Sequence, residues 1–96
     1  MTPEDLARTM SRVLRGSTSF ANMTRYIKNM ARIYPNEIIP ALAEIIKTGF
    51  QSTLDAKRRR CIKICRWVML FGNTHLGGRG RELLRELVRN HMPGQQ

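Results

Sequence analysis

Hydrophobic positions recur every three or four residues along most of the chain, the spacing of one face of an α-helix. Leu6, Met10, Val13 and Leu14 show it first, and no alternating strand pattern competes with it elsewhere. The periodicity predicts an all-α protein with about five short helices. The expected helices cover residues 3–15, 20–34, 36–48, 53–71 and 81–91.

Residues with strong positional preferences set the expected helix ends. Thr2 and Ser19 can cap the first two helices by accepting hydrogen bonds from free backbone N–H groups. Pro35 is expected to end the second helix, because the residue before a proline avoids helical geometry. Gly72 and Asn73 are expected to stop the fourth helix.

The third expected helix is apolar on nearly every side, with Ile and Ala at most positions from Ile38 to Ile46. Such a helix is usually buried, so we expect it to be the central helix or the heart of a dimer interface. Pro40 lies in or just before its first turn. The chain has 96 residues, of which 42% are hydrophobic, and is expected to form one compact domain over 1–96. Because so short a chain buries little surface, we also expect a helical homodimer.

The charge balance changes this picture most. The chain has 17 Lys and Arg against 7 Asp and Glu, a net charge of +10. This excess favours an anionic partner: a nucleic acid, an anionic membrane surface or an acidic protein. Thirteen of the cations are arginines, whose planar guanidinium groups bind phosphate in a two-pronged geometry.

The cations are also unevenly distributed, since residues 6–36 and 56–81 contain no acidic residue. Helical spacing gathers Arg25, Lys28 and Arg32 on one face, and Arg59, Lys63 and Arg66 on another, although like charges at these spacings repel. Arg8 and the arginines of the last helix have carboxylates nearby. The residues expected to contact nucleic acid are Arg25, Lys28, Arg32, Lys57, Arg58, Arg59, Arg60, Lys63, Arg66, Trp67, Arg79 and Arg81.

Two of these features allow more than one interpretation. Trp67 can stack on a base, hold a neighbouring cation over its ring, or pack against another helix or subunit. Residues 77–81, Gly-Gly-Arg-Gly-Arg, can offer N–H groups to an anion before the last helix, or form a flexible loop.

No residue pattern indicates an enzyme, a metal centre or a cofactor. Cys61 and Cys65 lie four apart on an apolar helix face, and we interpret them as core thiols; zinc binding completed by His75 or His91 is the alternative. The chain shows no signal peptide and no apolar run that could span a membrane, so a cytoplasmic or nuclear location is expected. Residues 57–60, Lys-Arg-Arg-Arg, also fit a minimal nuclear-localisation pattern.

The expected function is binding to the phosphate backbone of a nucleic acid with little sequence preference, slightly favouring double-stranded RNA over DNA. Size and charge suit a viral accessory, suppressor or nucleocapsid-type protein. No aromatic pair typical of single-strand readers is evident. One alternative is a structural protein that docks an acidic partner or an anionic membrane.

A second alternative is a DNA-binding regulator. Residues 43–54 resemble the turn of the helix-turn-helix motif, with a shorter turn and a longer second helix. That resemblance implies groove contacts by Gln51, Ser52, Thr53, Lys57 and Arg58.

Overall fold

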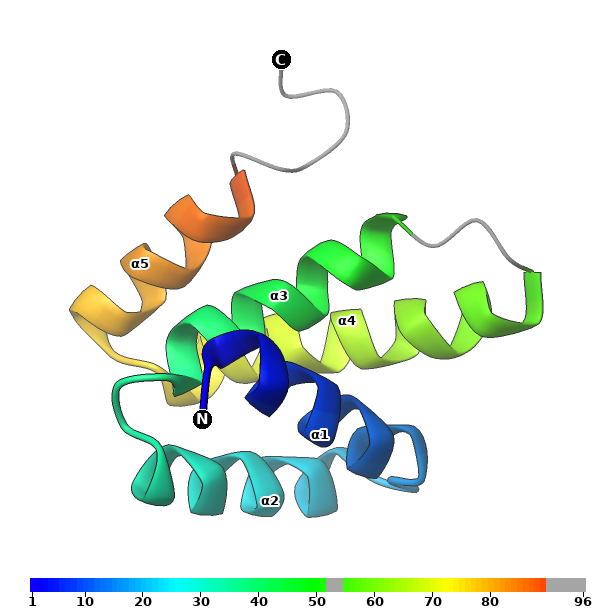
Figure 1. The fold of residues 1–96 in the computed structure, drawn as a ribbon, viewed down its shortest axis with the longest axis horizontal. Coiled ribbons are helices and arrows are strands. Elements are labelled where there is room, and N and C mark those ends of the chain that lie inside the picture. The colour runs from blue at the N-terminus through cyan, green and yellow to red at the C-terminus, as the bar shows by residue number, and fades with distance from the viewer. Residues whose placement is uncertain (52–54, 90–96) are drawn as a thin grey trace.

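Five α-helices make up the regular secondary structure of the described residues, 1–51 and 55–89, in the computed structural model; side chains are described for 1–49 and 62–89. The predicted all-α class is therefore confirmed. The helices are α1 Pro3–Arg15, α2 Phe20–Ile33, α3 Ile38–Gln51, α4 Asp55–His75 and α5 Gly78–Arg89 (Figure 1).

The apolar third helix lies at the centre of the molecule, as predicted. α3 contacts α1, α4 and α5, and α4 runs along it in the opposite direction (Figure 1). Full burial of a Leu or Ile side chain contributes about 1.5–3 kcal/mol, so this helix supplies a large part of the core. Its buried residues include Ile38, Ala41, Leu42, Ala43, Ile45 and Ile46.

The predicted caps of the first two helices are both present. Thr2 Oγ1 accepts a hydrogen bond from the Asp5 N–H at 3.1 Å, and Ser19 Oγ accepts one from the Asn22 N–H at 3.1 Å. α2 ends at Ile33, one residue earlier than predicted, with Tyr34 as its C-cap. Each cap satisfies a backbone donor that the helix itself leaves free.

The predicted stop of α4 at Gly72 and Asn73 is wrong, because the helix continues to His75. Gly72 is buried against α5, and a Cβ at this position would lie 2.7 Å from Leu84 Cδ2. The glycine therefore allows a close approach between two helices instead of ending one. This cannot be read from the sequence, since the partner of Gly72 is twelve residues away.

The start of α5 also differs from the prediction. The helix begins at Gly78 and not at Arg81, so most of the expected glycine-rich loop forms its first turn. Only Leu76 and Gly77 lie between α4 and α5. Gly78 has a φ of 20°, a backbone conformation that side-chain-bearing residues rarely adopt. The predicted loop over residues 77–81 is thus corrected to a two-residue connection, Leu76 and Gly77, followed by the first turn of α5.

The start of α3 is likewise shifted, from residue 36 to Ile38, with Pro40 in the first helical turn. A proline is tolerated there because first-turn N–H groups have no partner within the helix. The Ile38 N–H donates instead to the carbonyl of Tyr34 at 3.0 Å. The turn between α2 and α3 is therefore closed by backbone bonds across the proline at position 35.

Candidate nucleic-acid interface

The outer face of α2 presents three cations to solvent. Arg25, Lys28 and Arg32 are all exposed, while Met23 and Ile27 on the opposite face are buried. Within the described side chains, none of the three cations forms an ion pair, because the one salt bridge found there joins Arg8 to Asp5. α2 contains no acidic residue. Its positive field is therefore not neutralised by its own helix.

Tyr26 adds no negative charge to α2 at neutral pH. Burial raises the pKa of the Tyr26 phenol above its ordinary value, and the nearby Tyr34 raises it further. Both effects disfavour the charged form of an acid. The helix thus remains purely cationic across the physiological range.

The α1 arginines differ from those of α2 because carboxylates accompany them. Arg8 donates to Asp5 Oδ1 at 3.3 Å, an exposed pair of the kind that contributes at most about 1 kcal/mol. A polar cleft of about 530 Å³ lies between α1 and α3. Its lining includes Arg8, Arg12 and Arg15, but also Glu4 and Glu44. An anion in this cleft would meet both signs of charge.

A shallow hollow of about 480 Å³ lies between α2 and the end of α4. It is lined by Phe20, Ala21, Thr24, Arg25, Lys28 and His75. His75 is stacked against Phe71, with ring centroids 5.3 Å apart and planes inclined by 29°, and its ring centroid lies 6.3 Å from that of Phe20. No acidic side chain lines this hollow. The structure thus joins two of the predicted cations to an aromatic cluster that sequence reasoning missed.

On α4, Lys63 and Arg66 are exposed, as expected for a binding face, while Trp67 is half-buried. The Lys63 ammonium lies 4.6 Å from the centroid of the Trp67 ring, within the range of a cation–π interaction. Trp67 also packs against the hydrophobic core. Trp67 therefore both holds a neighbouring cation over its ring and packs against other helices. The side chains of Lys57, Arg58, Arg59 and Arg60 lie outside the described residues.

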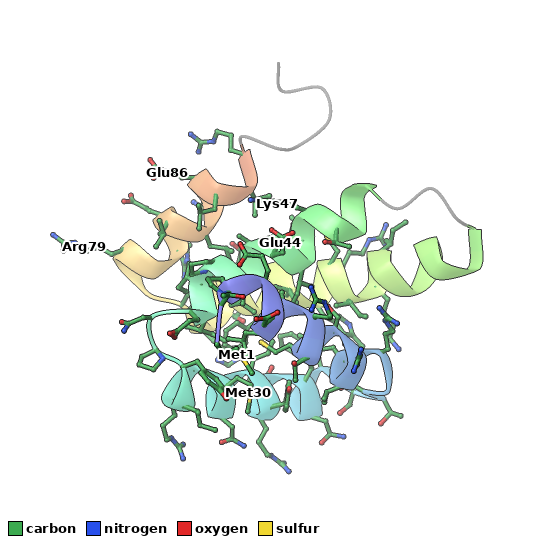
Figure 2. The ribbon with its side chains drawn as sticks, in the orientation of Figure 1. Met1, Met30, Glu44, Lys47, Arg79 and Glu86 are labelled. Carbon is green, nitrogen blue, oxygen red and sulfur yellow. The ribbon has the colours of Figure 1, made fainter. Side chains whose placement is uncertain are left out.

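Arg81 has a structural role that the sequence did not reveal. Its Nη2 donates to the carbonyl oxygens of Asn73 at 2.6 Å and Leu76 at 3.1 Å, the last turn of α4 and the residue after it. A cation at a helix C-terminus is favoured by the helix dipole. Arg85 Nη2 lies 3.5 Å from Asn73 Oδ1. Arg79, by contrast, is exposed and points away from the molecule (Figure 2).

A groove of about 280 Å³ runs beside these arginines, between α3, α4 and α5. Ile46, Met69, Leu84 and Val88 give it an apolar floor. Its polar border comes from Asn73, Arg81, Arg85 and Arg89. This groove therefore combines an apolar surface with a border of cations.

Comparison with protein-family models, curated proteins and solved structures finds no match.

Among the described residues, no group of three or more His, Cys, Asp and Glu side chains could hold a metal ion. Cys65 is buried, and its Sγ lies 3.7 Å from the Ile46 carbonyl oxygen. Cys61 and His91, the other members of the zinc set considered, lie outside the described side chains. Among the described helices, none has both the length and the apolar character needed to cross a membrane.

The two helices of the helix-turn-helix resemblance, α3 and α4, run along one another in opposite directions (Figure 1). Ser52 and Thr53 lie outside the described residues, as do the side chains of Gln51, Lys57 and Arg58.

Proposed function

We propose that the protein binds the phosphate backbone of nucleic acid through the outer face of α2, with little sequence specificity. The observation that carries this proposal is the row of Arg25, Lys28 and Arg32, exposed and without an acidic neighbour on their helix. Lys63 and Arg66 of α4 offer further exposed cations. Duplex RNA is the first ligand to test, ahead of duplex DNA.

The dimensions of this row suit a nucleic-acid strand. Arg25 and Arg32 are seven positions apart. At about 1.5 Å per residue along a helix, their Cα atoms lie about 10 Å apart. Phosphates of one strand recur about every 3.4 Å along a duplex axis. Three cations over this length can therefore contact a short run of phosphates on one strand, a contact that reads charge and not sequence.

The test replaces all three α2 cations by glutamine and compares the variant with a matched one in which Arg8, Arg12 and Arg15 of α1 become glutamine. Both variants lose three positive charges. The measurement is affinity for a blunt RNA duplex, a DNA duplex and anionic vesicles over a salt series. We expect the slope of log K against log salt for a duplex to become less steep by about 2.7 in the α2 variant. In the α1 variant it should become less steep by less than about 1.

Equal losses in the two variants would show that binding follows net charge, and the α2 assignment would be wrong. Absence of duplex binding by the unmodified protein would overturn the function itself. Stronger binding to anionic vesicles than to either duplex would favour the membrane alternative. Circular dichroism and thermal unfolding of each variant check that the fold is retained.

A second candidate function is suggested by the groove beside α5, whose apolar floor and arginine border match an amphipathic helix with an acidic stripe on a partner protein. Arg85 and Arg89 are exposed there. A peptide helix with leucines on one face and glutamates beside them is the probe. Binding that is lost on changing Arg85 and Arg89 to glutamate, with duplex affinity retained, would support this function and place it on a separate surface.

A further inference from the structure

The hollow between α2 and α4 has the composition of a base-stacking site. Phe20 is half-buried and His75 is exposed, so part of each ring borders solvent. The buried Phe71 stacks on His75 and fixes it from the core side. Aromatic rings that are supported in this way lose little freedom when a flat ligand packs against them.

Two cations border the same hollow. Arg25 and Lys28 follow Phe20 by five and eight residues along α2. Both line the hollow, to which α4 contributes His75. A nucleotide unit carries a flat, apolar base face next to a negative phosphate. The hollow offers a complementary surface to each part: rings for the base and cations for the phosphate.

The remaining lining bears on the class of ligand. Ala21 is small, and no carboxylate lines the hollow to bind a metal ion or a cationic ligand. The exposed lining is largely apolar, so a free inorganic anion would leave most of it uncovered. A ligand with both a stacking face and an adjacent anion fits better than either part alone.

We infer that this hollow binds an unpaired base of a nucleic-acid strand, with the base against His75 and Phe20 and its phosphate at Arg25 and Lys28. The inference rests on the proposed function and deepens it. Bases of a blunt duplex are paired and stacked on their neighbours, so an unpaired base comes from an overhang or a loop. The protein should therefore prefer a duplex that carries an unpaired nucleotide over a blunt duplex.

The experiment compares a blunt RNA duplex with the same duplex carrying one unpaired 2-aminopurine nucleotide at its 3′ end. Base–aromatic stacking corresponds to roughly tenfold in affinity, so we expect about tenfold tighter binding of the overhang and quenching of 2-aminopurine fluorescence. The variant His75→Ala should reduce the preference to less than about twofold and restore the fluorescence. Its affinity for the blunt duplex should stay within about twofold.

Two further variants separate stacking from other causes. His75→Tyr keeps an aromatic ring without an imidazole. If stacking causes the preference for the overhang, this variant should retain it. If the charge of the histidine causes it, the variant should lose it. Phe20→Leu keeps apolar volume for folding but removes the second ring, and it should lower the preference about threefold. Thermal unfolding checks that each variant folds.

Equal binding of blunt and overhanging duplexes, or a preference that survives His75→Ala, overturns the inference while the proposed function stands. Failure of both duplexes to bind overturns the proposed function, and the inference with it.

Discussion

The arginines of α2 and α5 show how one residue type, aligned along a helix in both cases, can have different surroundings. Arg25 and Arg32 of α2 face solvent, with no ion-pair partner among the described side chains. Arg81 of α5 is half-buried and donates to carbonyl oxygens at the end of α4, and Arg85 lies beside Asn73. The difference comes from the neighbouring helix: α5 follows α4 after two residues, and the carboxyl end of α4 carries free acceptors.

This comparison teaches that an arginine of a basic stripe is fully available to an external anion only where the fold provides no internal acceptor for it. On α5, Arg81 already donates hydrogen bonds to carbonyl oxygens of its own chain. The stripe on α2 has no such acceptor and is available to an external anion.

Replacing Arg81 by alanine should lower the free energy of unfolding by about 2 kcal/mol, because hydrogen bonds from a charged donor contribute about 1.5–3 kcal/mol. Replacing the exposed Arg25 by alanine should change it by less than about 0.5 kcal/mol. Urea unfolding monitored by circular dichroism measures both. If the two variants lose equal stability, the distinction between a structural and a free arginine fails.

Replacing Gly72 by alanine tests how closely α5 is held against α4. The added Cβ would lie 2.7 Å from Leu84 Cδ2, so Leu84 or the helix must shift. Crowding of this kind costs about 1–3 kcal/mol, and alanine returns up to about 1 kcal/mol through its higher helix propensity. We expect a net loss near 1 kcal/mol, seen as a lower melting temperature. Ala21→Gly on the exposed face of α2 is the control for the propensity contribution. An unchanged or higher melting temperature for Gly72→Ala would show that the junction has room to adjust.

The fold was largely predictable because its signals are local. Capping residues Thr2 and Ser19, the apolar stripes and the all-apolar third helix each act within a few positions, and the helices they predict are present. The ends of α4 and α5 were not predictable. A glycine that ends a helix and a glycine that admits a neighbouring helix look alike in sequence, and Gly72 is of the second kind.

The candidate site was only partly predictable for the same reason. Exposure of Arg25, Lys28 and Arg32 follows from helical spacing and was foreseen. The proximity of Arg25 and Lys28 to His75 was not, because α2 and the end of α4 are far apart in sequence. Phe20 and His75 are 55 positions apart and meet only after α2 packs against α4. The role of Arg81 depends in the same way on the position of the α4 terminus. The homodimer and the preference for RNA stay predictions.

The smallest expected effect concerns Lys63, whose ammonium lies over the Trp67 ring. An exposed cation–π interaction contributes about 0.5–1 kcal/mol, so Lys63→Ala should lower stability by about 0.5 kcal/mol, and Arg66→Ala by less. Trp67 is the only tryptophan, and its fluorescence should change in Lys63→Ala but not in Arg66→Ala.

Lys63 is intermediate between the structural Arg81 and the free Arg25. It contacts Trp67 of its own helix, yet it is exposed enough to contact a phosphate. If duplex RNA alters Trp67 fluorescence in the unmodified protein and this response disappears in Lys63→Ala, the nucleic-acid surface extends from α2 onto α4. A response that is unchanged in Lys63→Ala would exclude Lys63 as its source.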